Sequence, residues 1–413
     1  MYDPTFHPKT LHAELNLADY LRDKALFNPA YEDALITKSI ARVAAGYGGV
    51  KLKSNSINKS TVYQLSDLAD EIVLRKIGRN IKRVTRVRQT NRTSIVKCLR
   101  RLTSEGLPFR VYKIDIKNFY ASIDTKLLLA PIITDSAFPP STISLLESFF
   151  SEMARLEISG LPRGLGLSAV LSEYVMRDFD SQVGRIPGVF FYARFVDDMI
   201  FITSGTEEPN KFLKSINSTL PTGLFFNPTK TRPYFFGPQV KGVPFKIEHE
   251  VDFLGYVFRI GNAQRSGPKI NRDIIVDISD KKVKRIKTRI CVALREYIKD
   301  RNFENLTDRI RMLTANYTFF DAATKTRRKA GIYHSYHLID AEKSTSLDEL
   351  DLFLKKMLLS NQGKICRELF GLLDRRDRRY LMKYSFSRGF HNRTYFHLPT
   401  NRIAYLRRCW NNG

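Results

Sequence analysis

The pattern of hydrophobic and polar positions changes along the chain. From about Phe109 to Arg259, short β-prone runs alternate with helical stretches and with turns rich in Pro and Gly. The β-prone runs are FRVYKIDI, VFFYARFV, MIFITS and VDFLGYVFRI. After Asn271 the apolar residues recur every three to four positions, which is the spacing of a helix. The sequence therefore predicts an α+β lobe followed by an all-helical region.

The first helix expected in the second region begins at Ser279 or Asp280, because either residue can cap its first turn. Its apolar positions are Val283, Ile286, Ile290, Leu294 and Tyr297. Its outer positions carry Lys281, Lys282, Lys284, Arg285, Lys287 and Arg289. A second helix, LDELDLFLKKMLL, is expected over residues 347–359. The remainder of the chain is basic and aromatic.

A stretch without acidic residues lies between Glu71 and Glu105, in a segment that reads as helices. Its basic residues are Arg75, Lys76, Arg79, Lys82, Arg83, Arg86, Arg88, Arg92, Lys97, Arg100 and Arg101. Such a run is often only a solvated face. It also fits a surface that binds the phosphates of a nucleic acid. In that interpretation Arg83 and Arg86 are candidate nucleotide-binding residues.

Composition narrows the class of partner. The chain has 413 residues, 43% of them hydrophobic, so it can bury a large core divided over two or three lobes. Its 68 basic and 42 acidic residues give a formal charge of +26, which implies a polyanionic partner. Nucleic acid is the first candidate and a membrane surface the second. No apolar run approaches the length of roughly 18 residues that a membrane span needs, which argues against the membrane.

The expected location is a reducing cytoplasm. The opening residues MYDPTFHPKTLHAELN lack the apolar core of a signal peptide. The four cysteines are Cys98, Cys291, Cys366 and Cys409. They are widely separated and form no CxxC or Cys/His cluster, so neither a zinc site nor a disulfide framework is indicated.

Carboxylates stand at the ends of strands in the α+β lobe. VYKIDIKNFYASID ends a β-prone run at Asp115, and FFYARFVDDMIFIT places Asp197 and Asp198 between two apolar runs. The second pattern predicts a hairpin with acids at its tip. Asp is a common turn residue, but adjacent carboxylates between apolar flanks repel each other and are poorly solvated. Bound Mg²⁺ would remove the conflict, and two ions about 4 Å apart can clamp a nucleotidyl transfer.

These residues resemble the motifs of right-handed reverse transcriptases, and they occur in that family's order. Asp115 matches the metal ligand of the first motif, and the letters FVDD, ending in Asp197 and Asp198, match the aromatic-x-Asp-Asp motif. Phe replaces the commoner Tyr in the latter. GLPRGLGLSAVLSE resembles the motif that positions template and incoming nucleotide. Here Arg163 precedes Gly164, where many relatives have Gln, so its contact with the nucleotide would involve a phosphate.

Three further matches extend the resemblance. GLFFNPTKT resembles the fourth motif, whose lysine is expected to protonate the leaving pyrophosphate and is Lys230 here. The letters FLGY resemble the primer grip, formed by Phe253, Leu254, Gly255 and Tyr256. Tyr120 coincides with the aromatic residue that in this family excludes a 2′-hydroxyl, which implies a DNA product. The alternative interpretation of Lys230 is a solvated loop lysine, and the alternative interpretation of the letters FLGY is ordinary strand core.

The resemblance implies a right-handed polymerase fold in three segments. Residues 1–60 are expected to form an N-terminal extension, and residues 61–268 the fingers and a palm with an antiparallel sheet. Residues 269–413 are expected to form an all-helical thumb with a basic C-terminal extension. The implied cofactor is a pair of Mg²⁺ ions, which Mn²⁺ can replace. The implied partners are an RNA template, deoxynucleotides and a DNA product.

A finer resemblance points to the bacterial defence-associated reverse transcriptases of the unknown groups. It is strongest to the first of the paired enzymes in the third defence class. The segments that carry it are MYDPTF, LADEIVLRK, LPRGLGLSAVLSE, PGVFFYARFVDD, VDISDKKVKRIKTRI and GIYHSY. It implies a role in antiphage defence, a dedicated non-coding RNA as template, and a sister reverse transcriptase in a higher-order assembly.

Two other functions remain open from the sequence. One keeps the fold but adds deoxynucleotides without an external template or from a protein hydroxyl. The other is a catalytically idle scaffold that binds nucleic acid, and the presence of Lys230 with all three carboxylates argues against it.

Overall fold

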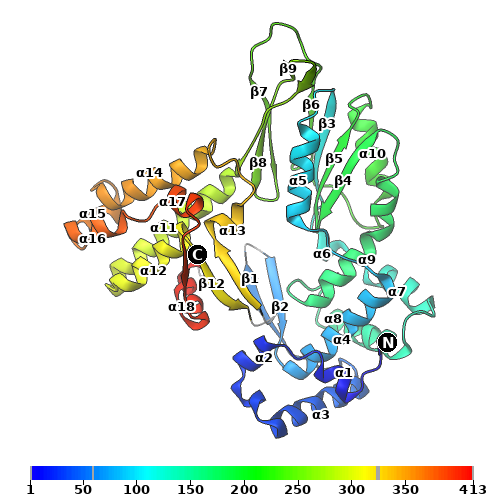
Figure 1. Ribbon diagram of the computed structural model, residues 1–413. Helices are drawn as coiled ribbons and strands as arrows, with labels where there is room; N and C mark the ends of the chain where they lie inside the picture. The colour runs from blue at the N-terminus through cyan, green and yellow to red at the C-terminus, as the bar shows by residue number, and fades with distance from the viewer. Residues whose placement is uncertain (1, 58–59, 322–325, 412–413) are drawn as a thin grey trace. The chain divides into compact units, whose positions relative to one another are not determined.

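A computed structural model describes residues 2–57, 60–321 and 326–411 (Figure 1). The chain divides into two compact units. The first contains the chain up to Asn91 and residues Pro108–Phe235, and the second contains Arg92–Leu107, Phe236–Asp321 and the chain beyond residue 325. The expected segment boundaries at residues 60 and 268 stay a prediction.

A four-stranded sheet forms the centre of the first unit, in the order β4-β5-β3-β6. Its strands are β3 (Phe109–Asp115), β4 (Val189–Phe195), β5 (Asp198–Thr203) and β6 (Arg232–Phe236). β5 pairs antiparallel with both β3 and β4. The mixed α+β class and the antiparallel sheet expected from the sequence are therefore confirmed.

The two faces of this sheet have different roles, because side chains alternate along a strand. On one face Tyr112 and Ile114 of β3 and Met199 and Phe201 of β5 are buried in the main core of the unit. Helices α8 (Pro140–Arg155) and α9 (Gly166–Val183) contribute to the same core. Asp115 and Asp198 alternate with these residues and therefore belong to the opposite face.

Helix α4 (Leu68–Thr85) connects the N-terminal part of the chain to this core. It packs against α3 (Pro29–Ala45) and α9, as Figure 1 shows. The smaller elements of the unit are α1 (Pro8–His12), α2 (Leu17–Arg22), η1 (Lys24–Phe27), the hairpin β1 (Leu52–Ile57) and β2 (Ser60–Leu65), α6 (Phe119–Ser122), α7 (Thr125–Thr134) and α10 (Pro209–Thr219).

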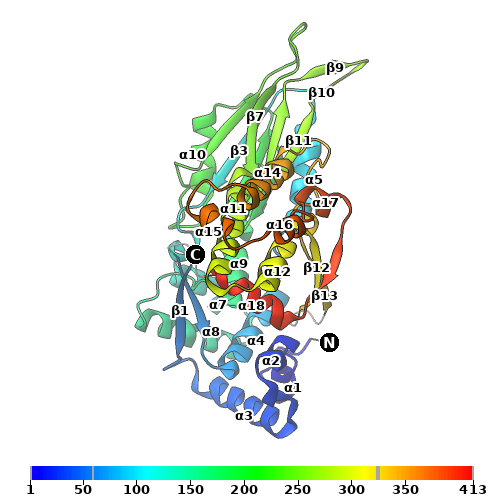
Figure 2. The same cartoon turned by 90° about the vertical axis from the view of Figure 1, so that its left-hand side faces the viewer.

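The second unit contains a three-stranded sheet and a layer of helices. The sheet has the order β11-β8-β7 and is formed by β7 (Ile247–Phe253), β8 (Tyr256–Gly261) and β11 (Ile274–Ile278). α11 (Asp280–Asp300) packs against α12 (Phe303–Thr314) and α14 (Thr345–Leu359), as seen in Figure 2. The other elements are α5 (Arg92–Thr103), the ribbon β9 (Gln264–Ser266) and β10 (Lys269–Asn271), α13 (Ile332–Tyr336), α15 (Lys364–Phe370), α16 (Arg375–Leu381), α17 (Phe386–His391) and α18 (Thr400–Asn411).

The expected helices at 280–297 and 347–359 are confirmed. All five apolar positions expected on the first of them are buried in α11. Ser279 is its N-cap residue, although its side chain makes no capping hydrogen bond. None of the helices in the described part of the chain is long and apolar enough to cross a bilayer.

The prediction that residues 269–413 are all helical is wrong. β12 (Asn316–Asp321) lies between β13 (Thr326–Gly331) and β14 (Tyr395–His397) in a second three-stranded sheet. The pairing with β14 is parallel and joins segments far apart in the sequence, which buries Tyr317 and Phe396 in one cluster. These short strands contain or adjoin charged residues and have no clear two-residue period, so the sequence pattern did not predict them.

Candidate active site

The three candidate metal ligands come together at one end of the β3–β5–β4 sheet. Asp115, the last residue of β3, lies directly opposite Asp198, the first residue of β5. Asp198 also lies opposite Phe195, so Val196 and Asp197 form the turn between β4 and β5. Val196 has a φ of 62°. The predicted hairpin with acids at its tip is confirmed.

Burial and mutual repulsion oppose ionisation of the two adjacent acids. Burial, followed by the charges of Asp197 and Asp115, raises the pKa of Asp198 from 3.8 to about 6. Lys113 and Lys230 partly oppose this shift. Burial and the charge of Asp115 also raise the pKa of Asp197. The site therefore gathers more negative charge than its surroundings can solvate, and a bound cation would be stabilised there.

Lys230 and Asn227 hold Asp115 from the loop before β6. The Lys230 ammonium donates to both carboxylate oxygens at 3.0 and 3.1 Å, and the Asn227 amide donates to one of them at 3.2 Å. The Asn227 backbone N–H donates to the Asp115 carbonyl oxygen at 2.7 Å. The structure thus places Lys230 beside a candidate metal ligand, as expected, while Asn227 was not identified from the sequence.

A buried arginine supports the turn between β4 and β5. Arg194 of β4 is 5% exposed and donates to the carboxylates of Glu173 and Asp180 on α9. It also donates to the Val196 carbonyl oxygen at 3.0 Å, inside the turn that carries Asp197. The neighbouring carboxylates raise the pKa of Arg194, so its charge is fixed. The sequence contained a signal for this residue, since Arg is the one charged residue of VFFYARFV and two acids stand seven positions apart on α9.

A cavity of 460 Å³ brings Tyr120, Arg163, Gly164 and Asp197 together. Tyr120 is the second residue of α6, and burial raises the pKa of its hydroxyl. The Arg163 guanidinium lies 5.8 Å from the centre of the Tyr120 ring. An aromatic ring and a cation therefore stand at the same opening as a candidate metal ligand, an arrangement suited to a nucleoside phosphate.

The loop before α9 is anchored to the hairpin of β1 and β2. The Tyr63 N–H donates to the Arg163 carbonyl oxygen at 2.7 Å, and the Arg163 side chain donates to the Ser60 hydroxyl at 2.8 Å. Gly164 has a φ of 98°, and a Cβ there would lie 2.5 Å from the Tyr63 carbonyl oxygen. Only glycine fits this conformation and this close approach. The position of Arg163 thus depends on β2.

The donor set fits Mg²⁺ chemically, although the ligands are not preassembled. Within the described ranges no group of three or more His, Cys, Asp or Glu side chains is arranged to hold a metal ion. In this structure the Lys230 ammonium forms an ion pair with Asp115 and donates to both of its carboxylate oxygens. Mg²⁺ nevertheless prefers hard carboxylate oxygens, and a bound Mg²⁺ would offset the negative charge that these residues bring together. Release of Asp115 by Lys230 would free those oxygens.

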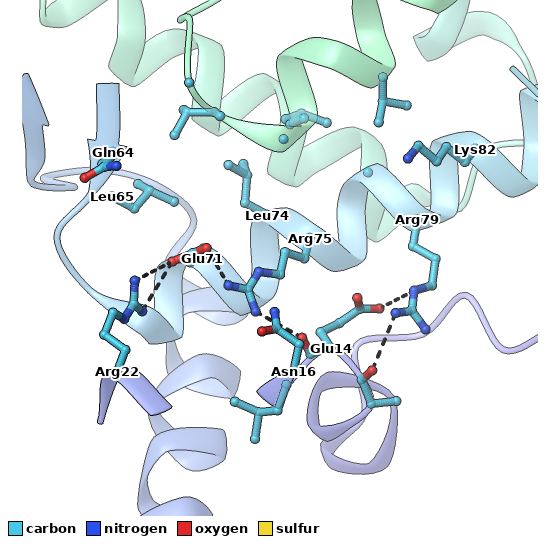
Figure 3. Close-up of a pocket in the computed structure, with 18 residues that line it drawn as sticks. Glu14, Asn16, Arg22, Gln64, Leu65, Glu71, Leu74, Arg75, Arg79 and Lys82 are labelled. Atoms are coloured by element: carbon cyan, nitrogen blue, oxygen red, sulfur yellow. Dashed lines mark hydrogen bonds and ion pairs between the residues drawn. The ribbon is translucent and has the colours of Figure 1, made fainter. Parts of the chain in front are cut away.

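Part of the basic stretch has a structural role rather than a surface one. Lys76 is 2% exposed and donates to a backbone carbonyl, and Arg75 and Arg79 form ion pairs with acidic residues of the N-terminal segment. For Lys76 the expected phosphate-binding surface is wrong, because α4 buries this residue against that segment. Arg75 and Arg79 are partly or largely exposed, but their charges are engaged in these ion pairs, as Figure 3 shows for Arg79. Arg83 and Arg86 are exposed, and Arg83 lies 5.2 Å from the ring centre of Tyr2.

The expected primer grip is a tight hairpin in the second unit. Leu254 and Gly255 connect β7 to β8 with φ values of 48° and 80°, as a two-residue turn requires. Arg92 donates two hydrogen bonds to the Leu254 carbonyl oxygen at 2.9 and 2.6 Å, and its guanidinium lies 4.9 Å from the centre of the Tyr256 ring. Arg92 was not identified from the sequence as a support for this turn.

Comparison with solved structures gives distant similarities to fungal telomerases. Apo telomerase from Candida tropicalis, truncated from its C-terminal domain, has a TM-score of 0.37 and 15% identity, covering 56% of this chain and 58% of that one. Telomerase from Candida albicans, in complex with a TWJ fragment of telomeric RNA, has a TM-score of 0.36 and 12% identity, covering 87% and 64%. The chain thus spans less than two thirds of the length of either telomerase.

A search among curated proteins gave no match. The sequence pattern of one family, described as "Reverse transcriptase (RNA-dependent DNA polymerase)", matches residues 52–258, which is half of the chain. The match includes the β1–β2 hairpin, the three carboxylates, the Arg163 loop and Lys230. The chain belongs to the reverse transcriptase family.

Proposed function

We propose that this protein is an active RNA-directed DNA polymerase that adds deoxynucleotides to a primer 3′ end by two-metal nucleotidyl transfer. The observation that carries the proposal is the strand register. It sets Asp115 opposite Asp198 and places Asp197 in the adjoining turn, at the opening that also contains Tyr120. A chain that had lost catalysis would have no reason to keep three mutually repelling carboxylates in a poorly solvated position.

The carboxylates of Asp115, Asp197 and Asp198 would hold two Mg²⁺ ions, or Mn²⁺ in their place. When bound, these ions supply the positive charge that activates the attacking 3′-oxygen and stabilises the transferred phosphate. Arg194 fixes the turn that carries Asp197, so this ligand keeps its position while Lys230 releases Asp115.

Lys230 has a second role in the proposed reaction. Its side chain is 60% exposed and sits on Asp115 by two hydrogen bonds. Movement of the Nζ atom away from Asp115 releases the carboxylate for the metal. The same atom can then donate a proton to the leaving pyrophosphate, as expected for the lysine of the fourth motif.

Tyr120 and Arg163 position the incoming nucleotide. The Tyr120 ring would lie against the sugar and leave no room for a 2′-hydroxyl, which favours deoxynucleotides over ribonucleotides. Arg163 would bind a phosphate through its guanidinium. Gly164 allows the loop to approach β2 closely, and Arg83 and Arg86 offer exposed charge for the nucleic-acid backbone. The hairpin Phe253–Tyr256 would hold the primer end.

The biological setting is part of the proposal. The segments shared with the defence-associated group support a role in bacterial antiphage defence, acting in the cytoplasm. The same resemblance supports a dedicated non-coding RNA as template and a sister reverse transcriptase in a larger assembly. The formal charge of +26 supports a structured RNA partner, because each neutralised phosphate releases counterions.

Incorporation of labelled deoxynucleotides by the purified chain tests the proposal. Asp197→Ala and Asp198→Ala should each abolish incorporation on an RNA template in the presence of Mg²⁺ and leave the circular dichroism spectrum unchanged. Asp178→Ala is the matched control, because that side chain is 76% exposed on α9 and lies outside the site. Unchanged incorporation by the double variant of the two adjacent acids would refute the polymerase assignment.

The same assay separates the competing functions. Incorporation that persists after the RNA is digested, with the label bound to protein, would identify a template-independent or protein-primed polymerase. RNA binding without incorporation by the wild-type chain would identify a scaffold.

A further inference from the structure

The sheet β13-β12-β14 of the second unit joins two parts of the chain whose sequences contain no acidic residue. One part is residues 326–339, and the other runs from Arg378 onward. β13 belongs to the first part and β14 to the second, and both pair with β12 (Figure 2). The single acidic residue of the three strands is Asp321, at the end of β12. The sheet is therefore a place where positive charge gathers.

One face of this sheet is packed against helices. Tyr317 of β12 and Phe396 of β14 lie opposite each other and are buried in one cluster. Met312 of α12 and Ile403 and Leu406 of α18 belong to the same cluster, and both helices lie beside β12 in Figure 1. Because side chains alternate along a strand, the residues before and after Tyr317 and Phe396 belong to the other face.

Contacts across the strands show which residues share that other face. Thr318 of β12 lies opposite Lys329 in β13 and opposite His397 in β14. Its hydroxyl oxygen is 3.3 Å from Nδ1 of His397. The Lys329 ammonium lies 5.2 Å from the ring centre of Tyr395, two positions before His397. Phe320 follows Thr318 by two positions and therefore points to the same side.

The rings and cations of this face are accessible. Tyr395 is 39% exposed, and His397 and Lys329 are exposed as well. The Tyr395 hydroxyl forms a hydrogen bond with Nε2 of His334, which holds the ring in place. Arg327 lies opposite Phe320 and is exposed. Among the residues that the structure describes, neither Lys329 nor Arg327 has a carboxylate within ion-pair distance.

Exposed rings beside unpaired cations on a sheet face suit an unpaired nucleic-acid strand. Bases of any identity stack on such rings, and the phosphates between them bind the cations. A duplex keeps its bases stacked on one another, so it cannot use the rings. Tyr395 and His397 are two residues apart, or roughly 6.6 Å along the strand, which lets each ring take its own base.

The polar groups between the rings favour RNA over DNA. The Thr318 hydroxyl and the His397 imidazole can each hydrogen bond with a 2′-hydroxyl, which RNA has and DNA lacks. They lie next to each other on the open face. This is the reverse of the arrangement proposed at Tyr120, where a ring leaves no room for that group.

We propose that the open face of this sheet is a binding platform for single-stranded RNA. The platform consists of Thr318, Phe320, Arg327, Lys329, Tyr395 and His397. Its rings stack on bases, and its cations bind the phosphates. The inference goes beyond the proposed polymerase activity, because it uses none of the residues assigned to nucleotide transfer. It also gives a function to the part of the C-terminal region that folds as a sheet.

Binding is measured with the full chain in EDTA and without deoxynucleotides, so the result does not depend on polymerisation. Fluorescence anisotropy follows a labelled 12-nucleotide uridine RNA, the thymidine DNA of the same length, and the RNA paired with its complement. Cross-linking from 4-thiouridine in the single-stranded RNA maps the contacts.

Tyr395→Ala and Lys329→Ala are the test variants, and Tyr395→Phe keeps the ring while it removes the hydroxyl. Tyr31→Ala on α3 and Lys214→Ala on α10 are the matched controls, because Tyr31 is 45% exposed and Lys214 is exposed. Trp410 packs against the cluster on the opposite face of the sheet, so its fluorescence reports whether the sheet stays folded.

We expect Tyr395→Ala to raise the dissociation constant of the single-stranded RNA by at least about fivefold, the loss of one stacked base. Tyr395→Phe and the two controls should change it less than about twofold. Lys329→Ala should flatten the logarithmic salt dependence by about 0.7, the share of one phosphate of a single strand. The DNA and the duplex should bind more weakly than the single-stranded RNA, and cross-links should lie within residues 393–397.

The proposal is overturned if Tyr395→Ala, with unchanged Trp410 fluorescence, binds the single-stranded RNA as tightly as Tyr31→Ala does. If that fluorescence changes, the comparison of Lys329→Ala with Lys214→Ala decides in the same way. A duplex bound as tightly as the single strand also overturns the platform, and DNA bound as tightly as RNA overturns its assignment to RNA. Failure of the polymerase assay with intact, Tyr395-dependent binding would refute the proposed function and leave this platform standing.

Discussion

Replacing Asp198 by Asn should stabilise the metal-free protein at neutral pH. Asp198 lies between Asp115 and Phe195 in the sheet, and burial with two neighbouring carboxylates raises its pKa from 3.8 to about 6. Asn has the same shape and no charge. The substitution therefore removes the repulsion with Asp197 and Asp115 but keeps the packing, and the attraction from Lys113 and Lys230 is too weak to cancel the gain.

The sign and size of the effect follow from proton linkage. Between pH 4 and pH 6 the folded protein holds a proton on Asp198 that the unfolded chain has released, so stability falls as the pH rises through that window. The difference between 3.8 and about 6 corresponds to about 3 kcal/mol. At pH 7.5, Asp198→Asn should accordingly be more stable than the wild type by up to about 3 kcal/mol. Near pH 4 the difference should nearly disappear, because the wild-type carboxyl is then protonated in the folded state.

Urea unfolding in EDTA at four pH values between 4 and 7.5 measures this difference. Circular dichroism reports both units, whereas the fluorescence of Trp410, the chain's single tryptophan, reports the second, so the transition of the first unit can be identified. Asp178→Asn on the exposed face of α9 makes the same change in net charge. Mg²⁺ should stabilise the wild type more than Asp198→Asn and narrow the gap. A wild type whose stability does not fall relative to Asp198→Asn over this pH range would refute the reasoning.

Two further predictions concern the neighbours of the carboxylates. Tyr120→Ala should increase the use of ribonucleotides relative to deoxynucleotides by at least about tenfold, equivalent to roughly 1.4 kcal/mol of lost discrimination. Single-nucleotide incorporation measures this ratio of ribonucleotide to deoxynucleotide use. An unchanged ratio would contradict the role assigned to Tyr120. Arg194→Met should cost about 3 kcal/mol or more in urea unfolding, because Glu173 and Asp180 lose a buried partner. Arg194→Lys should recover part of that stability but need more Mg²⁺ for half-maximal incorporation, since the three donors of an ammonium cannot replace the five hydrogen bonds that the guanidinium makes to the two acids and the Val196 carbonyl.

The sequence by itself determined the elements whose patterns are local. Apolar runs on both sides of Asp197 and Asp198 required a hairpin, because only the turn leaves two adjacent carboxylates near water. The three-to-four spacing from Val283 to Tyr297 required a helix with one buried face. The order of the polymerase motifs along the chain indicated the reverse transcriptase family. The hairpin and the helix depend on residues within a few positions of one another, and the family assignment depends on the order of short motifs along the chain, so none of them requires knowledge of the rest of the fold.

The tertiary structure decided which side chains meet. Lys230 and Asn227 reach Asp115 from more than a hundred positions away, and Arg194 joins two acids of α9 to the turn that carries Asp197. The same applies to Lys76, which the sequence presented as one cation of a basic run and the fold buries. Strand β12 pairs with β13 and also with the distant β14, and the sequence pattern indicated neither pairing. Such contacts depend on strand register and helix packing, which are set by the whole core, whereas periodicity records only the face on which a residue lies.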